Sequence, residues 1–122
     1  MSVDIVFYTE EDGSIPLVEW LDRLIPKVRD KAIVRLERLM EFGHELRRPE
    51  ADYLRNGIYE LRVCYRRVQY RMLYFFYRKS IVVISHGLVK KQVVPEKEIQ
   101  KAIERKARFE ENPEIHSAGG ST

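Results

Sequence analysis

The amino-acid sequence predicts an α+β fold: an antiparallel, twisted sheet with two N-terminal helices packed on one face, followed by a C-terminal helix. Apolar residues recur at helical spacing through residues 28–40, whereas aromatic and aliphatic residues alternate with other residues through 58–77. Because helices repeat every 3.6 residues and strands every 2, these patterns separate the two kinds of element. Short connections between consecutive strands indicate antiparallel pairing.

The first strand and the first helix are expected within residues 3–24. Residues 3–8 form a short β-branched and aromatic run, which is typical of a strand. The sequence Asp12-Gly13-Ser14 then breaks the strand, and Asp12 or Ser14 is expected to cap a helix that continues through Trp20 and Leu24.

The second helix is expected to begin near Pro26, since proline is tolerated in a first helical turn. Gly43 ends it. Its apolar side is formed by Val28, Ala32, Leu36, Leu39 and Met40. Residues 46–52, which include Pro49, are expected to form a polar loop.

Three long strands are predicted to follow as an antiparallel meander. Asn56-Gly57 favours a tight turn between Tyr53-Leu54 and a strand at residues 58–65. Arg66-Arg67 connects this strand to residues 68–77, and residues 78–80 lead into the strand at 81–86. Pro95 and Glu96 open the last helix, and Asn112-Pro113 ends it.

The length of 122 residues suits a single domain. We expect this domain to span residues 1–112 and residues 113–122 to form a disordered tail. The lone Cys64 excludes an intramolecular disulfide and suits a reducing cytoplasm. The N-terminal residues lack the apolar run of a signal peptide or membrane span, and no Cys/His cluster has metal-ligand spacing. A cytoplasmic protein without membrane association, metal or other cofactor is therefore expected.

Charge is unevenly distributed along the chain. Residues 1–52 carry 8 Lys/Arg and 12 Asp/Glu, a net charge of −4, whereas residues 53–109 carry 14 Lys/Arg and 4 Asp/Glu, a net charge of +10. Such asymmetry suggests that the basic part binds a nucleic acid or an acidic protein. Several arginines lie inside predicted strands, and guanidinium matches phosphate because it donates two parallel hydrogen bonds.

Strand alternation assigns these arginines to one face of the sheet. The apolar sets Tyr59, Leu61, Val63, Tyr65 and Tyr70, Met72, Tyr74, Phe76 are expected to face the helices. Arg62 and Arg71 are then expected on the opposite, open face, on neighbouring strands. Strict alternation places His86 with Val82 and Ile84, and it leaves open which face that set occupies.

The ordered set of motifs in residues 53–102 resembles the RelE/ParE superfamily of bacterial toxins, specifically its phage-derived HigB-like branch. The resemblance extends over about residues 3–109 and implies a RelE-like fold. In the family a phenylalanine often stands two places after the histidine, where this chain has Leu88. The motifs that carry the resemblance are Leu54, Gly57, Glu60-Leu61-Arg62, Tyr70-Arg71, Tyr74, His86-Gly87, Lys90-Lys91, Pro95, Glu98, Ile99 and Ala102.

The resemblance implies the toxin of a type II toxin–antitoxin system, with a HigA-like helix-turn-helix antitoxin as its partner. RelE and HigB toxins are ribosome-dependent, metal-independent mRNA endonucleases that inhibit translation, so mRNA and the ribosome are further expected partners. Two alternatives stay open: a ParE-like inhibitor of DNA gyrase, which binds without catalysis, and a non-catalytic basic nucleic-acid-binding module. Fold alone does not separate these activities.

Cleaving RNA without a metal requires activation of the ribose 2′-OH, stabilisation of the phosphorane and protonation of the 5′-oxygen. Arg62 is the principal candidate for stabilising the phosphorane, with an ion pair to Glu60 as the structural alternative. Arg71 is expected to assist it or to bind the RNA backbone. Glu60 is expected to orient Arg62 without reacting.

Lys90 and Lys91 are candidates for binding phosphate, and one of them for acting as general acid. The alternative for this pair is an ordinary solvated turn. His86 is a candidate general acid or base, or a histidine hydrogen-bonded within the structure. His44 and His116 are expected to take no part.

Overall fold

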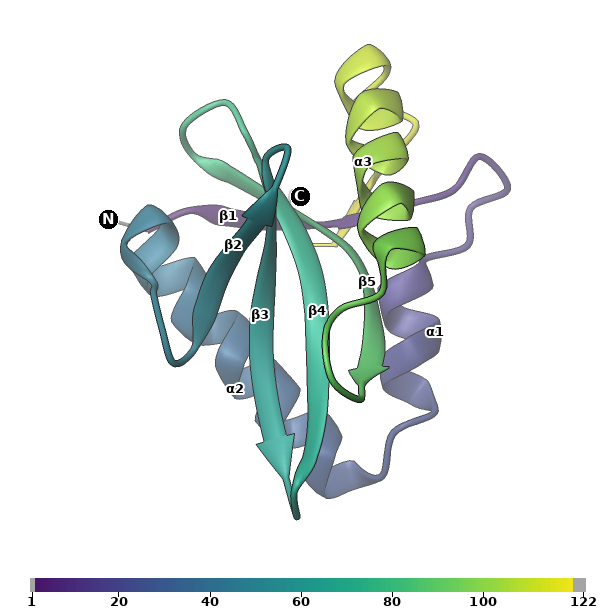
Figure 1. Ribbon diagram of the computed structural model, residues 1–122. Helices are drawn as coiled ribbons and strands as arrows, with labels where there is room; N and C mark the ends of the chain where they lie inside the picture. The colour runs from purple at the N-terminus through teal and green to yellow at the C-terminus, as the bar shows by residue number, and fades with distance from the viewer. Residues whose placement is uncertain (1, 120–122) are drawn as a thin grey trace.

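The computed structural model describes residues 2–119 and confirms the α+β fold class (Figure 1). Its elements follow in the order β1 (Asp4–Tyr8), α1 (Pro16–Asp22), α2 (Pro26–Phe42), a short 3-10 turn (Gly43–Glu45), β2 (Ala51–Arg55), β3 (Ile58–Tyr65), β4 (Val68–Tyr77), β5 (Ile81–Lys90), α3 (Glu96–Glu111) and β6 (Ser117–Gly119).

All strands of this part of the chain join one sheet in the order β2-β3-β4-β5-β1-β6. Strands β3 to β5 form the predicted antiparallel meander, β2 pairs antiparallel with β3 ahead of it, and the N-terminal β1 lies parallel to β5. The tight turn between β2 and β3 is confirmed, since Asn56 and Gly57 both have positive φ angles, of 52° and 81°. Figure 1 shows β1 crossing the direction of β3, so the sheet is strongly twisted.

The two N-terminal helices cover one face of the sheet, as predicted. The core on this face includes Leu17 and Trp20 of α1, Ala32 and Leu36 of α2, and Leu61, Met72, Tyr74 and Ile84 of the sheet. Gly87 in β5 is required here, because a Cβ atom at this position would lie 2.2 Å from the Trp20 ring. Of the four tyrosines assigned to this face, Tyr74 is buried in this core and Tyr59 and Tyr70 pack against it, whereas Tyr65, at the end of β3, is not part of it.

Helix α3 packs against the opposite face, so that face is only partly open. Its core contacts join Ile99, Ala102 and Phe109 of α3 to Ile58, Leu73, Phe75 and Val83 of the sheet. The sheet is thus a central layer between α1 and α2 on one side and α3 on the other (Figure 1). On β3, α3 packs against Ile58 at the start of the strand, whereas Arg62 further along the strand stays partly exposed.

Three local expectations were wrong. Helix α1 has no side-chain cap: Ile15 is its N-cap, and Ser14 instead donates its backbone N–H to Asp12 Oδ1 at 2.9 Å. Residues 51–52, predicted to lie in a loop, begin β2. Strand β5 continues four residues beyond His86, to Lys90.

The C-terminal segment also differs from the expected disordered tail. Residues 117–119 form β6, which pairs with β1. His116, which was expected to take no part, is buried there, with its Nδ1 2.7 Å from the Thr9 carbonyl oxygen and its ring stacked on Tyr8. Residues 120–122 of the expected tail lie outside the described residues. Within residues 2–119, no helix has the length and apolar character needed to cross a membrane.

Candidate functional site

Cross-strand pairing brings the predicted site residues onto the α3 face of the sheet. Residues directly opposite each other on neighbouring strands share a face. Three successive rows therefore cross the sheet: Asp52, Glu60, Leu73 and His86; then Arg62, Arg71 and Leu88; then Cys64, Gln69 and Lys90. The expectation that Arg62 and Arg71 share one face is confirmed, and they are direct partners.

Glu60 holds both arginines through one carboxylate. Its Oε2 accepts a hydrogen bond from Arg62 Nε at 2.8 Å, and its Oε1 accepts one from Arg71 Nε at 3.0 Å. Glu60 itself is 3% exposed. Such charge-assisted bonds fix the planes of both guanidinium groups. The predicted role of Glu60 in orienting Arg62 fits this geometry. The ion pair between Glu60 and Arg62, which was the structural alternative, is also present.

The two arginines differ in their access to solvent. The Arg62 side chain is 27% exposed, whereas the Arg71 side chain is 4% exposed. Burial lowers the pKa of Arg71 and the ion pair with Glu60 opposes this shift, so its guanidinium stays charged. Its Nη1 also donates to Gln69 Oε1 at 3.2 Å and to the Tyr70 carbonyl at 3.0 Å. The expectation that Arg71 lies on an open surface was therefore wrong. Arg62 is the accessible cation of the pair.

Asp52 extends the network towards the edge of the sheet. Its Oδ2 accepts from Arg62 Nη2 at 3.3 Å and is 2.8 Å from Arg48 Nη2. The hydrogen bond from Arg48 lowers the pKa of Asp52, so this carboxyl group is ionised at neutral pH. Two carboxylates thus lie among three guanidinium groups, and the cluster keeps a net positive charge.

The paired lysines lie beyond this network at the end of β5. Lys90 is partly buried and lies opposite Gln69, on the same face as Arg62, whereas Lys91 is exposed in the bend before α3. Within residues 2–119, neither lysine has a carboxylate at ion-pair distance. Both ammonium groups are therefore available to an anion at this end of the sheet.

A β-bulge decides the position of His86. Leu73 pairs with His86 but Tyr74 pairs with Ile84, so Ser85 is an extra residue that interrupts the alternation of β5. His86 consequently lies on the α3 face, and its expected grouping with Val82 and Ile84 was wrong.

Both ring nitrogens of His86 have partners within the protein. Nε2 is 2.8 Å from Glu98 Oε1 on α3, and Nδ1 is 2.7 Å from Ser85 Oγ. Burial lowers the pKa of His86 to about 4, although the hydrogen bond with Glu98 opposes the shift. The neutral ring therefore donates its Nε2 proton to the Glu98 carboxylate and accepts from the Ser85 hydroxyl. With 6% exposure, His86 connects α3 to β5 and does not face the solvent.

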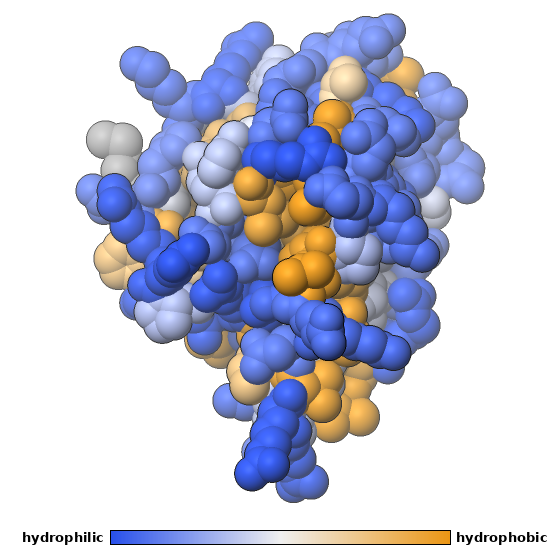
Figure 2. Space-filling model, viewed as in Figure 1, coloured by the Kyte–Doolittle hydropathy of each residue, from blue (hydrophilic) through white to orange (hydrophobic). Residues whose placement is uncertain are grey.

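The surroundings of the charged network are partly apolar. Figure 2 shows an apolar strip along the seam between β4 and α3, with hydrophilic side chains on both sides of it. At the other side of the network, a pocket of about 470 Å³ flanks β2 and is lined by Arg48, Asp52, Tyr53 and Tyr59, among others. Apolar and aromatic walls exclude water and strengthen the electrostatic interactions beside them. Within residues 2–119, no group of three or more His, Cys, Asp or Glu is arranged to hold a metal ion.

A comparison with known protein families identifies the family of this chain. Residues 19–107 match the family described as Phage derived protein Gp49-like (DUF891). The chain belongs to this family. No curated protein matches the sequence.

The matched range of this Gp49-like protein contains every predicted site residue: Arg62, Arg71, His86, Lys90 and Lys91, together with Glu60. It leaves out β1 and the C-terminal segment that pairs with it. The site thus belongs to the part that the chain shares with its family.

Three residues of the network were missed by sequence reasoning: Arg48, Asp52 and Gln69. Arg48 and Asp52 were assigned to a polar loop, where charged residues carry no particular signal. Gln69 follows the alternation that placed Arg71 on the same face, so its position was available from the sequence. The contact of Gln69 with Arg71 Nη1 could not be predicted from the sequence, because it depends on side-chain rotamers.

Proposed function

We propose that this Gp49-like protein is the toxin of a type II toxin–antitoxin system of the RelE/HigB kind. Its activity is ribosome-dependent, metal-independent cleavage of mRNA, which inhibits translation. The family is related to RelE and HigB toxins, and this relation supports the toxin assignment at the coarse level. The endonuclease activity rests on the site itself.

One observation carries the activity: a partly exposed Arg62 is fixed in orientation by Glu60 and Asp52 on the open part of the sheet. A cation that is already oriented stabilises a developing negative charge without the cost of reorganisation. The buried Arg71 supports Arg62 by occupying the other oxygen of Glu60. We therefore assign Arg71 to positioning in this proposal.

The proposed reaction is an internal transfer within the RNA. The ribose 2′-oxygen forms a bond to the neighbouring phosphorus while the bond from phosphorus to the 5′-oxygen breaks. The products are a 2′,3′-cyclic phosphate and a free 5′-hydroxyl. One proton passes from the 2′-OH to solvent water, and one is delivered to the 5′-oxygen as it leaves.

Arg62 stabilises the two equatorial phosphorane oxygens in this reaction, since its fork geometry matches them. Lys90 or Lys91, which lie at the end of β5 beyond the arginines, bind the phosphate and supply the proton to the leaving oxygen. His86 is not assigned a proton-transfer role, because both of its ring nitrogens are occupied and the side chain is buried.

The proposed partner that neutralises the toxin is a HigA-like helix-turn-helix antitoxin encoded beside it. The net charge of +10 over residues 53–109 favours an antitoxin with an acidic segment, or one that blocks the α3 face of the sheet. Co-expression with the product of the adjacent gene should restore growth and yield a complex that co-purifies. If neither is observed, the toxin–antitoxin assignment fails.

The activity is tested by primer extension on mRNA from cells that express the protein. The expected result is cleavage within translated regions, and its disappearance from an mRNA whose start codon is removed. Absence of cleavage combined with inhibition of gyrase supercoiling would instead establish the ParE-like activity. Absence of both, with retained RNA binding, would identify a non-catalytic module.

A further inference from the structure

A second basic surface lies on α2, away from the ion-pair network. Lys27, Lys31 and Arg35 occur at every fourth residue of the helix and so form one stripe along it. All three line a groove of about 350 Å³ between α2 and β3, whose other walls include Val63 and Cys64. Asp30 is the acidic side chain in this lining. The groove therefore has an excess of positive charge that the proposed reaction does not use.

The lysines of this stripe are available to a ligand. Lys27 and Lys31 are exposed, and within residues 2–119 neither has a carboxylate at ion-pair distance. Arg35 is partly buried and lies 3.3 Å from Glu50, which also accepts two hydrogen bonds from Arg38. Glu50 is thus shared by two guanidinium groups and does not neutralise both.

The edge of β3 beside this groove is uncovered. Pairing between β2 and β3 reaches only Leu61, and the next contact is the hydrogen bond from the Arg62 N–H to the Glu50 carbonyl. Beyond that point the β3–β4 hairpin extends past β2, as Figure 1 shows. Its tip consists of the exposed Arg66 and Arg67, and Arg66 lies over the Tyr65 ring at 5.3 Å. Cations therefore continue from the groove to the end of the hairpin.

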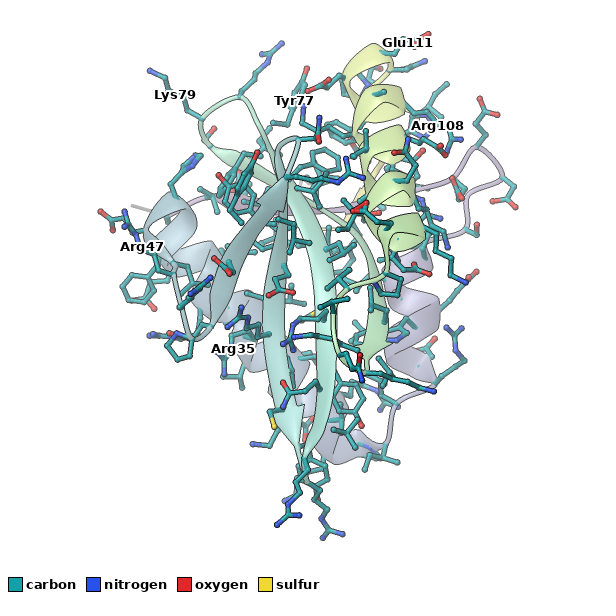
Figure 3. The ribbon with its side chains drawn as sticks, in the orientation of Figure 1. Arg35, Arg47, Tyr77, Lys79, Arg108 and Glu111 are labelled. Carbon is teal, nitrogen blue, oxygen red and sulfur yellow. The ribbon has the colours of Figure 1, made fainter. Side chains whose placement is uncertain are left out.

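The groove and the candidate site meet at this edge. Cys64 lines the groove, yet its side chain belongs to the same sheet face as Arg62, two residues earlier on β3. Two residues of a strand span about 7 Å. In Figure 3, Arg35 lies between α2 and β3, which is the strand that carries Arg62. A polyanion bound at Arg62 can therefore continue over the edge of β3 into the groove.

We propose that the groove between α2 and β3 binds the sugar–phosphate backbone of RNA, with Lys27 and Lys31 each contacting a phosphate. Successive residues of the stripe rise by about 6 Å along the helix, which is comparable to the separation of neighbouring phosphates in an RNA strand. Lysine ammonium groups contact phosphates without reading the bases, so the binding is independent of sequence. The backbone belongs either to mRNA flanking the cleaved bond or to ribosomal RNA. This inference extends the proposed function to a second contact region.

The test compares two variants with the same loss of charge. Lys27→Gln/Lys31→Gln removes two positive charges from the groove. Arg78→Gln/Lys79→Gln removes two from the exposed turn between β4 and β5, at the opposite end of the sheet, where Figure 3 labels Lys79. Affinity is measured by fluorescence anisotropy at salt concentrations from about 50 to 200 mM, with a single-stranded RNA oligonucleotide and with small ribosomal subunits free of mRNA.

The groove variant should bind at least about tenfold more weakly at low salt. Its plot of log affinity against log salt should flatten by about 1.4, since each single-strand phosphate contact contributes about 0.7. The control variant should bind like the wild type. An effect confined to the oligonucleotide assigns the groove to mRNA, and one confined to the subunits assigns it to ribosomal RNA. Equal behaviour of both variants in both assays overturns the proposal, as does a loss of antitoxin binding without a loss of RNA binding.

Failure of this inference is distinguishable from failure of the proposed function. If the wild type cleaves mRNA on ribosomes while Lys27→Gln/Lys31→Gln binds RNA normally, the groove is not an RNA site and the nuclease assignment stands. If RNA binding depends on these lysines but the wild type does not cleave, the groove is an RNA-binding site and the nuclease assignment fails.

Discussion

The pair formed by Glu60 and Arg71 provides the sharpest test of the architecture of the site. Both side chains are 4% exposed and are joined at 3.0 Å. Replacing Glu60 by Met leaves the Arg71 guanidinium buried without a counter-charge. Breaking a buried ion pair in this way costs about 3–5 kcal/mol, because the remaining charge is not solvated. For a chain of this size, that corresponds to a fall in Tm of about 12–20 °C.

The assay is urea denaturation followed by the fluorescence of Trp20, which is the only tryptophan and is buried against Gly87. Three variants complete the cycle: Glu60→Met, Arg71→Met and the double variant. The double variant removes both charges and should be more stable than either single variant, within about 2 kcal/mol of the wild type. Arg62 keeps Asp52 as a partner throughout. Wild-type stability of Glu60→Met, or strictly additive losses in the double variant, would refute the reasoning.

Three further predictions concern pH, packing and metal. Burial lowers the pKa of His86 from 6.5 to about 4, so the unfolded chain binds the extra proton between these values, and the free energy of unfolding should fall by about 3 kcal/mol as the pH drops through that window. Urea denaturation at several pH values measures this fall, and His86→Gln should abolish it. Gly87→Ala should destabilise the fold by about 1–3 kcal/mol, because the added methyl group overlaps the Trp20 ring; an unchanged denaturation midpoint would show that the ring moves freely. Cleavage on crosslinked ribosomes should persist in EDTA, whereas specific restoration of lost activity by zinc or manganese would contradict the charge-based chemistry.

The sequence was sufficient to predict the meander and the face shared by Arg62 and Arg71. Alternation with period two depends only on backbone geometry, and the Asn56-Gly57 turn fixes the start of β3. The same alternation failed for His86, because the bulge at Ser85 adds one residue that no period-two pattern anticipates. Gly87, directly after His86, is the kind of signal that marks an irregular strand.

The burial of Arg71 was not predictable from alternation. A strand pattern assigns a side chain to a face, but what covers that face depends on contacts between distant segments. Here α3 covers part of the face and Glu60 compensates the buried charge. The position of Asp52 in the site was not predictable for a related reason. Its segment joins the sheet as β2, although its own sequence is typical of a loop. The C-terminal β6 depends in the same way on the partner strand β1.

The central claim is that Arg62 acts on the phosphate in the transition state. It is tested most directly by single-turnover cleavage of mRNA on programmed ribosomes with Arg62→Ala and Arg62→Lys, using thermal melting as the folding control. Losing one oriented cation should reduce the rate about a hundredfold to a thousandfold, corresponding to roughly 3–4 kcal/mol. Arg62→Lys should recover little of it, since an ammonium group lacks the planar fork held by Glu60. A folded Arg62→Ala variant that cleaves at nearly the wild-type rate would contradict the account.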